Sequence, residues 1–241
     1  MSPKILTIDI ETAPAIVYSF GLHNQNHSID QIIQSPYMLC FAAKWHDEDE
    51  VMFFKGDSEM VLEAHKLLDE ADVVVHFNGN SFDVPHLNRE MWLLGLPPYS
   101  PFQPIDLLKV FRKQFRFISN KLDHLVQEAG LGAKLSHSGF KMWPQVMNGD
   151  PEAWKLFEEY NKTDVVLTEA LYDRTLPWVP NHPNVLLYEE NPGQLSCPTC
   201  GGRIHRRGER QLATGIYERY QCTECFAWSR KTKRLDGATV R

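Results

Sequence analysis

The sequence predicts an α/β protein in which a mixed sheet flanked by helices is followed by a small cysteine-bearing domain. Short apolar runs alternate with segments of helical hydrophobic spacing through most of the 241 residues. Two closely spaced cysteine pairs lie near the C-terminal end. A chain of this length can hold one large domain and a small appendage. We therefore expect a main domain over residues 1–178, a proline-bearing linker over 179–194 and a small domain over 195–241.

Charge is distributed unevenly along the chain. The formal net charge is −6, yet residues 193–241 hold ten Lys/Arg against four Asp/Glu, which leaves 15 Lys/Arg and 27 Asp/Glu in residues 1–192. An acidic body with a basic tail suggests metal chemistry in one part and polyanion contact in the other, although random surface charge would give the same imbalance. The sequence has no apolar run of about 18 residues and no signal-peptide pattern, so we expect a cytoplasmic protein without a membrane partner.

The first apolar run carries two acidic residues at its end. Ile5–Asp9 is rich in β-branched residues and predicts a buried strand, and Glu11 follows two positions later. Residues i and i+2 of a strand point to the same face, so Asp9 and Glu11 lie side by side. Two buried like charges require a neutralising cation, and carboxylate oxygens favour Mg²⁺ or Mn²⁺. The alternative is a strand that runs out into a solvated loop.

The rest of the main domain reads as alternating strands and helices. Further strands are expected at residues 38–45, 51–54, 73–77 and, more briefly, at Ile105. Helices are expected over 58–71, 81–94, from Asp106, over 122–129 and over 150–176. The polar stretch between residues 13 and 36 is expected to be an irregular loop near the carboxylates that could act as a substrate-facing lid.

Two more acidic residues lie where a buried metal site could recruit them. Asp83 follows a strand and a turn, and Asp164 lies one helical turn after Tyr160 on the last long helix, so these two share a helix face. Four carboxylates from three segments can hold two divalent ions about 3.5–4 Å apart, the arrangement used in phosphoryl transfer. Tyr160 could orient or help deprotonate an attacking water. Each carboxylate alone could equally be a surface residue or a helix cap.

These residues lie in three motifs that resemble those of the DEDD 3′–5′ exonucleases. Asp9-Ile10-Glu11, Asn78-Gly79-Asn80-Ser81-Phe82-Asp83 and Tyr160-Asn161-Lys162-Thr163-Asp164 match the patterns DxE, NxxxFD and YxxxD in order. The last pattern marks the tyrosine branch, and the middle one is similar to that of the proofreading domains of family B DNA polymerases. The resemblance spans about residues 4–176. It implies a ribonuclease-H-like fold with a mixed five-stranded sheet flanked by helices.

The resemblance also implies roles for single residues. Asp9, Glu11 and Asp164 would hold the first ion, and Asp9 would bridge to the second ion, which Asp83 contacts. Asn78 would support Asp83 or the terminal nucleotide, and the other implied substrate-binding positions are Thr12 and Phe82. The remaining chain has no room for polymerase palm or fingers. A stand-alone exonuclease that acts with a DNA polymerase or another replication protein in trans is therefore expected.

The cysteine pairs predict a second metal site. They are Cys197 with Cys200 and Cys222 with Cys225, each in CxxC spacing. In a cytosolic chain this spacing indicates metal more often than disulfides, and four thiolates suit a closed, structural, tetrahedral Zn²⁺ site. With an apolar strand before the second pair, the segment looks like a zinc ribbon. Metal would supply much of the folding energy of so small a domain.

The ribbon sequence interleaves cations with aromatic residues, a composition that suits single-stranded nucleic acid. Arg206, Arg207 and Arg219 are the candidate contacts. Two alternatives remain open: the aromatics could brace the metal site while the cations are merely solvated, or the ribbon could dock a protein.

Taken together, the sequence predicts a metal-dependent 3′–5′ exonuclease that acts on single-stranded DNA or DNA 3′ ends in replication or repair. An RNA-processing exonuclease on the same fold is the first alternative, since no motif discriminates the sugar. The second is a nucleic-acid-binding protein with a vestigial nuclease site, against which the intact set of acidic residues argues.

Overall fold

A computed structural model describes residues 2–23, 25–46, 48–136, 139–188 and 195–237. The chain divides into two compact units, one comprising Lys4–Leu171 and the other the chain from Tyr172 onward with the first three residues. Among the helices of the described ranges, none has the length and apolar character that a membrane span requires.

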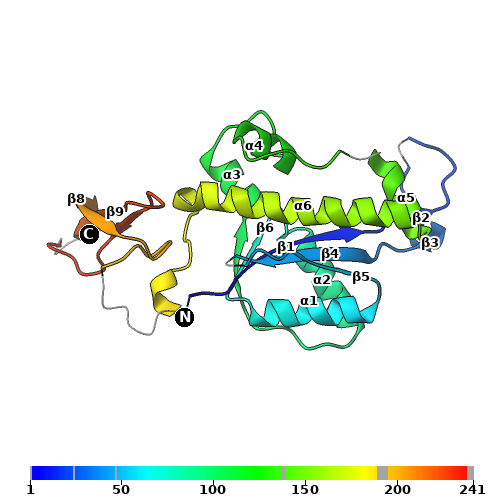
Figure 1. Cartoon of the computed structure of the whole chain (residues 1–241), viewed down its shortest axis with the longest axis horizontal. Helices are drawn as coiled ribbons and strands as arrows, with labels where there is room; N and C mark the ends of the chain where they lie inside the picture. The colour runs from blue at the N-terminus through cyan, green and yellow to red at the C-terminus, as the bar shows by residue number, and fades with distance from the viewer. Residues whose placement is uncertain (1, 24, 47, 137–138, 189–194, 238–241) are drawn as a thin grey trace. The chain divides into compact units, whose positions relative to one another are not determined.

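A five-stranded sheet forms the centre of the first unit, with the strand order β5-β4-β1-β6-β7 (Figure 1). The strands are β1 (Ile5–Thr12), β4 (Met38–Trp45), β5 (Met52–Lys55), β6 (Val73–His76) and β7 (Gln103–Asp106). The central strand β1 pairs antiparallel with β4 and parallel with β6, which in turn pairs parallel with β7. The predicted mixed five-stranded sheet is therefore confirmed.

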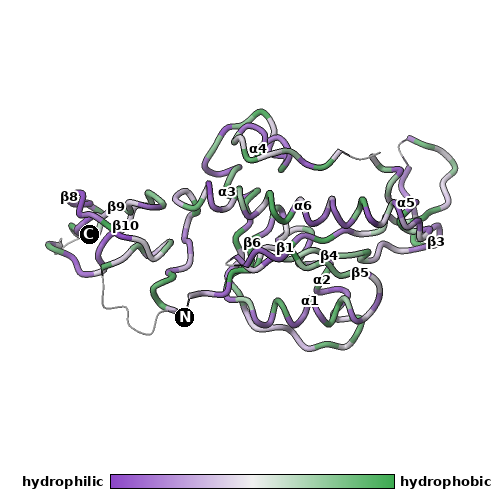
Figure 2. The backbone as a smooth tube through the Cα atoms, in the orientation of Figure 1, coloured by the Kyte–Doolittle hydropathy of each residue, from purple (hydrophilic) through white to green (hydrophobic). Residues whose placement is uncertain are grey.

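One face of this sheet packs on two helices, α1 (Ser58–Glu70) and α2 (Asp83–Leu93). Alternate residues of β1, namely Leu6, Ile8 and Ile10, are buried in the core shared with these helices. Because side chains alternate along a strand, Asp9 and Glu11 point to the other face. The tube of α1 in Figure 2 alternates between hydrophobic and hydrophilic colours, as expected for a helix that buries one side.

The long helix α6 (Pro151–Thr175) covers the face of the sheet that carries the acidic residues (Figure 1). It begins as predicted, because the Asp150 side chain accepts hydrogen bonds from the amides of Glu152 and Ala153 and Pro151 follows it. The short helix α5 (Met142–Met147), which the sequence did not predict, shares a core with α6 through Phe157. The remaining helices are α3 (Leu107–Gln114) and α4 (Leu122–Glu128).

The segment between β1 and β4 is more ordered than the irregular loop that the sequence predicts. It contains a small antiparallel pair, β2 (Ile16–Val17) and β3 (Ile32–Gln34), and a 3-10 turn at Ile29–Gln31. β-Branched residues favour this pairing. The hairpin exposes apolar side chains, with Phe20 fully exposed and Tyr18 71% exposed. Its role as a lid stays a prediction.

The second unit contains a three-stranded antiparallel sheet in the order β10-β9-β8. Its strands are β8 (Ile204–Leu212), β9 (Gly215–Cys222) and β10 (Trp228–Arg230). Within the predicted linker, a 3-10 turn at Val185–Tyr188 begins with a hydrogen bond from the Val185 amide to the Pro198 carbonyl at 2.8 Å. Residues 189–194 of that linker lie outside the described residues.

Candidate active site and zinc centre

The central strand β1 positions two of the predicted acidic residues. It runs three residues beyond its expected end at Asp9, to Thr12, so that Glu11 belongs to the strand and pairs in register with Cys40 of β4. Asp9 and Glu11 consequently share one face by strand alternation. Thr12 ends the strand where the register with β4 shifts.

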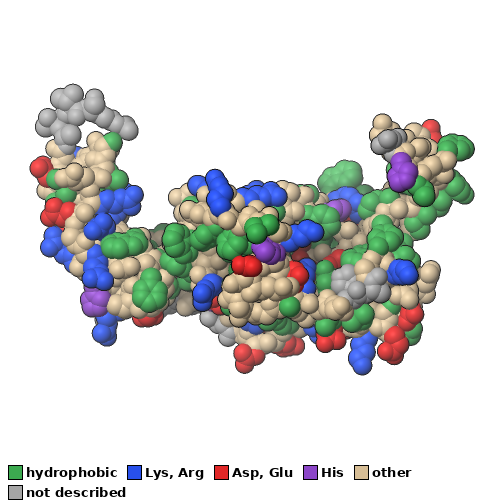
Figure 3. All heavy atoms as spheres, turned by 90° about the horizontal axis from the view of Figure 1, so that it is seen from above, with side chains coloured by type: hydrophobic (Ala, Val, Ile, Leu, Met, Phe, Trp, Pro, Cys, Tyr) green, Lys and Arg blue, Asp and Glu red, His purple; other side chains and the backbone are tan. Residues whose placement is uncertain are grey.

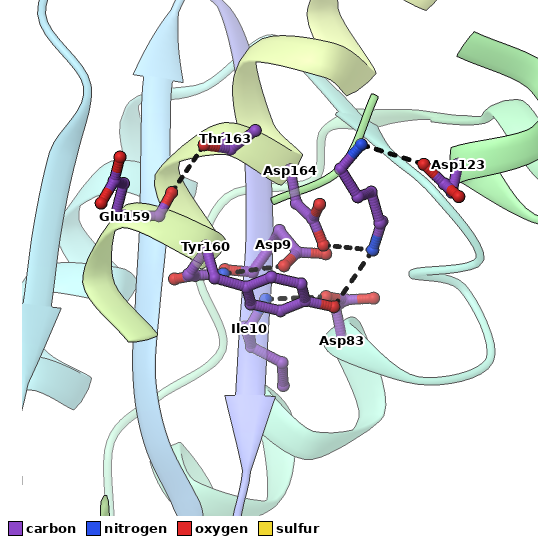
Figure 4. Close-up of polar contacts among 10 residues, drawn as sticks. Asp9, Ile10, Asp83, Asp123, Glu159, Tyr160, Thr163 and Asp164 are labelled. Atoms are coloured by element: carbon purple, nitrogen blue, oxygen red, sulfur yellow. Dashed lines mark hydrogen bonds and ion pairs between the residues drawn. The ribbon is translucent and has the colours of Figure 1, made fainter. Parts of the chain in front are cut away.

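Helix α6 brings the third carboxylate to the first two. One oxygen from each of Asp9, Glu11 and Asp164 lies within 4.8 Å of the others. Asp164 is 2% exposed and lies one turn after Tyr160, as the spacing predicts. Figure 4 shows both residues on α6, facing Asp9 on β1. Oxygen atoms this close repel one another unless protons or a cation intervene.

Asp83 approaches the same region from the start of α2 (Figure 4). It is 3% exposed, and its Oδ1 accepts a hydrogen bond from the Ile10 amide at 3.0 Å. This hydrogen bond fastens the helix start to the strand between Asp9 and Glu11. Asp83 is not part of the group within 4.8 Å, so its place as a ligand of a second ion stays a prediction.

The pKa values of these carboxyls are raised. Burial, followed by the charges of Asp83, Glu11 and Asp164, raises the pKa of Asp9 well above its usual value. Burial and the charge of Asp164 raise the pKa of Glu11 to about 8. Burial raises the pKa of Asp83 to about 7, against the opposing hydrogen bond from Ile10. Each raised pKa means that the ionised carboxylate is unfavourable in the folded protein unless a further cation lies nearby.

Lys134 supplies one positive charge that the sequence analysis missed. Its ammonium pairs with the Asp164 carboxylate and lies 3.2 Å from the Tyr160 hydroxyl and 5.0 Å from the centre of that ring. Burial lowers the pKa of Lys134, but the neighbouring Asp164 outweighs this and the net pKa is raised. Lys134 lies in an irregular segment with no helical or strand pattern, so only its distance to the motif residues reveals it.

Asn161 is a second residue whose role the sequence did not reveal, because it appeared only as one position of the third motif. Its side chain is fully buried, and its amide donates to Asp9 Oδ2 at 2.7 Å and to the Asp9 carbonyl at 3.2 Å. The same side chain therefore holds both the backbone and one carboxylate oxygen of Asp9. This fixes the Asp9 rotamer within the acidic group.

Tyr160 lies at the edge of the acidic group with its ring packed on Phe157 at a centroid distance of 6.4 Å. Burial and the charge of Asp164 raise the pKa of its phenol well above the usual value. Without a bound cation the hydroxyl is therefore protonated at neutral pH. Both roles predicted for Tyr160, orienting an attacking water and helping to deprotonate it, stay predictions.

A cleft of about 570 Å³ opens beside Lys134 and Asn78. Its other walls include Arg112, Asn120 and Lys121, so it presents cations and amides. Asn78 has the left-handed backbone angle φ 70°, and its backbone amide donates to Asp106 Oδ1 at 3.1 Å. Asn78 thus lines a cleft that could accommodate part of a nucleotide.

The other implied substrate-binding residue of this turn is Phe82. Its side chain is 39% exposed, and its ring packs against His86 with the ring centres 4.7 Å apart. Its contact with a substrate stays a prediction.

The three carboxylates fit a divalent cation by chemistry and by electrostatics. Carboxylate oxygens are the ligands that Mg²⁺ and Mn²⁺ prefer, and the three lie close enough to share one ion. The raised pKa values of Asp9 and Glu11 persist although Lys134 opposes them. One lysine is therefore too little charge for this group, and a divalent ion would restore the balance.

The four predicted cysteines of the second unit gather in one group with their sulfur atoms within 4.8 Å of one another. The distances are 3.7 Å between the sulfurs of Cys197 and Cys225 and 3.6 Å between those of Cys200 and Cys222. A disulfide would need about 2.05 Å, whereas a tetrahedron of thiolates about 2.3 Å from Zn²⁺ has edges of about 3.8 Å. The donor set therefore fits zinc.

The predicted ribbon cations differ in their surroundings. Arg206 pairs with Glu209 and Glu218, whereas Arg219 lies over the Trp228 ring and donates to the Arg207 carbonyl. Their contact with nucleic acid stays a prediction.

Comparison with known proteins agrees with this architecture. Residues 6–176 match the family model of the RNase H superfamily. A stretch of 76 residues is 33% identical to DNA polymerase 1 of Aeropyrum pernix and covers 30% of this chain but 8% of that protein.

A solved structure gives a second comparison. The family B DNA polymerase from the hyperthermophilic archaeon Pyrobaculum calidifontis aligns with a TM-score of 0.55 at 18% identity, over 73% of this chain and 25% of that one. The chain thus spans a small part of the length of these polymerases, and the structural likeness concerns the fold. Since the family model covers well over half of the sequence, the chain belongs to the RNase H superfamily.

Proposed function

We propose that this protein is a metal-dependent 3′–5′ exonuclease that releases nucleotides from DNA ends. The observation that carries the proposal is the group formed by Asp9, Glu11 and Asp164 on one face of an RNase H-like sheet, with Tyr160 at its edge. The two proteins compared above are DNA polymerases, which supports DNA as the substrate and replication or repair as the setting. A DNA polymerase or another replication protein acting in trans is the partner that this setting suggests.

The chain would hold its ions through the carboxylates. Asp9, Glu11 and Asp164 would bind one divalent ion, and Asp83 would contribute to a second from the start of α2. When bound, Mg²⁺ or Mn²⁺ would polarise the scissile phosphate and activate a water for hydrolysis. In the second unit Cys197, Cys200, Cys222 and Cys225 would bind a structural Zn²⁺.

The other residues of the site would orient the reactants. Asn161 holds Asp9 in a fixed rotamer through two hydrogen bonds. The Tyr160 hydroxyl, 3.2 Å from Lys134, would form a hydrogen bond with the attacking water or a phosphate oxygen. Lys134 offsets part of the charge of Asp164 and presents an ammonium where a phosphate would enter.

The cleft beside Asn78 supports a nucleotide as the ligand. It adjoins Lys134, and its walls combine Arg112 and Lys121 with the apolar side chains of Leu108 and Leu122. Cations suit the phosphate, and apolar walls suit a base or a sugar. None of these groups selects between DNA and RNA, so the experiment compares the two sugars directly.

The test is digestion of 5′-labelled DNA and RNA oligonucleotides of equal sequence with Mg²⁺ or Mn²⁺. We expect a ladder of DNA products shortened from the 3′ end and no shortening in EDTA, and the RNA arm measures the sugar preference. Asp9→Asn preserves the shape of the side chain and should abolish cleavage. Glu63→Gln removes a carboxylate from α1, on the opposite face of the sheet, and serves as the matched control. Undiminished cleavage by Asp9→Asn would contradict the proposal.

A further inference from the structure

The two faces of the ribbon sheet differ in how their cations are held. In the antiparallel pair of β9 and β10, Arg230 lies opposite Arg219 and Trp228 lies opposite Gln221. Opposed residues and residues two apart share a face, so Tyr217, Arg219, Trp228 and Arg230 lie together. Their contacts cross between the strands: Arg219 lies 4.7 Å from the centre of the Trp228 ring, and Arg230 lies 4.3 Å from that of Tyr217.

The opposite face is neutralised by Glu218. This carboxylate pairs with Lys231 at 2.5 Å and with Arg206 at 3.4 Å, and it accepts a hydrogen bond from the Tyr220 hydroxyl at 2.8 Å. Arg206 also pairs with Glu209 at 3.5 Å. Within residues 195–237, in contrast, no carboxylate forms an ion pair with Arg219 or Arg230. The face of Tyr217 and Trp228 therefore carries positive charge that lies on aromatic rings.

The two cysteine knuckles have the same backbone geometry. In each, the amide of the first cysteine donates to the carbonyl five residues later, at 2.8 Å for Cys197 and 3.0 Å for Cys222. The amide two residues after each of these cysteines donates to its sulfur at 3.4 Å. The residue after the second cysteine is left-handed in both, with φ 75° at Gly201 and φ 63° at Phe226.

Phe226 occupies a position that glycine would fill without strain. A bulky residue with positive φ is a rare and strained conformation, so the knuckle turn alone would favour glycine here. The Phe226 side chain is 63% exposed, so burial in the core does not explain it. Trp228, two residues later, is 52% exposed. Figure 3 shows Lys and Arg side chains beside hydrophobic ones on the visible face of the ribbon, at the left end of the view.

We propose that Phe226, Trp228, Arg219 and Arg230 form a stacking platform for the bases of single-stranded nucleic acid, with the buried Tyr217 ring supporting Arg230 from beneath. This inference rests on the proposed exonuclease function, which supplies strands of this kind. Aromatic faces bind bases of any sequence, but only unpaired bases expose their rings. The guanidinium groups would bind the phosphates between stacked bases, and the excess of cations over carboxylates in residues 193–241 favours a polyanion.

The test measures the affinity of the full-length, zinc-loaded protein for a labelled oligothymidine, by fluorescence anisotropy across a salt series in EDTA-free, magnesium-free buffer. An Asp9→Asn background prevents digestion. We expect Kd to rise about tenfold in Trp228→Ala and about fivefold in Phe226→Gly, with little change in the salt slope. In Arg219→Ala both the affinity and the slope should fall, the slope by about 0.7. Lys231→Ala removes one positive charge from the neutralised face, where Lys231 pairs with Glu218, and should raise Kd less than about twofold.

Phe226→Gly separates a binding role from a structural one. Because glycine fits the left-handed position, this variant should keep its zinc and melt at the same or a higher temperature while it loses affinity. Loss of zinc in Phe226→Gly would show that the ring braces the knuckle and would overturn the inference. Unchanged Kd in Phe226→Gly and Trp228→Ala would overturn it as well, and would leave the face to a protein partner.

Failure of the platform and failure of the proposed function give different results. A protein that digests DNA with Asp9 intact, while the ribbon variants bind like the parent, contradicts only the platform. A protein that does not digest DNA, while Trp228→Ala weakens binding, contradicts only the exonuclease.

Discussion

Asn161 determines how Asp9 is presented to the rest of the site. Its side chain is the hydrogen-bond donor to one Asp9 oxygen at 2.7 Å, inside a fully buried environment. We expect Asn161→Ala to weaken Mn²⁺ affinity about 10- to 100-fold, as loss of a group that orients a ligand typically does. Titration calorimetry checks this, with Lys162→Ala as the control from the next position on α6. An unaltered Mn²⁺ affinity in a folded Asn161→Ala protein would contradict the positioning role.

Tyr160 is separable from the proposed metal ligands because its hydroxyl does not belong to the carboxylate group. Tyr160→Phe removes that hydroxyl and keeps the ring packing on Phe157. We expect the single-turnover rate to fall about 10²-fold or more, with Mn²⁺ affinity unchanged. A rate within about twofold of the parent would mean that Tyr160 only packs.

The raised pKa values make metal-free stability depend on pH. Folded Glu11 has a pKa of about 8 and folded Asp83 of about 7, both above their unfolded values. The folded state therefore binds more protons than the unfolded state. Stability is full below the unfolded pKa near 4 and is lost as pH rises through about 7 to 8. We expect the melting temperature in EDTA to fall over this range and Mn²⁺ to restore it most at the alkaline end.

Glu11→Gln supplies the matched variant for this pH dependence. It removes one of the opposed charges, so it should melt above the parent near pH 8 in EDTA and close to it near pH 4.5. A difference in melting temperature between the two proteins that is the same at every pH would contradict the unfavourable charge of Glu11. With Mn²⁺ present, the variant should melt below the parent near pH 8, because it has lost a ligand for the ion.

At the scale of elements, the sequence predicted those parts of the site whose side chains follow a regular period. Asp9 and Glu11 were found by strand alternation, and Tyr160 and Asp164 by the helical turn on α6. The cap at Asp150 set the start of that helix correctly. These patterns depend only on neighbouring positions in the sequence, so they can be recognised without knowledge of the fold.

The parts that sequence reasoning missed depend on contacts between distant segments. Lys134 reaches Asp164 across 30 positions from a segment without a periodic pattern. Asn161 reaches Asp9 across 152 positions, and its burial is decided by the packing of α6 on β1. The pairing of β2 with β3 was also missed, because polar residues separate the two short apolar runs.

At the scale of the whole molecule, acidic and basic functions are divided between two units of the chain. The carboxylates lie in the unit Lys4–Leu171, whereas the cysteine group and the ring-bound Arg219 and Arg230 lie in the second unit. This division accounts for the opposite charge balances of the two parts. An acidic group that holds cations repels phosphates until they bind, so a separate basic unit that captures the strand would raise the affinity for substrate.

Removing the ribbon tests this division of roles. Deletion of residues 193–241 should raise KM for single-stranded DNA and flatten its salt dependence, since each lost phosphate contact removes about 0.7 from the slope of log K against log salt. The loss should appear in KM rather than in kcat, because the carboxylates belong to the other unit. Cys222→Ser should behave like the deletion, because three thiolates hold zinc poorly and the small domain then unfolds. Steady-state rates across a salt series for the three proteins decide the matter: equal slopes would show that the ribbon takes no part in holding DNA, and a fall in kcat would show that the two units share the chemistry.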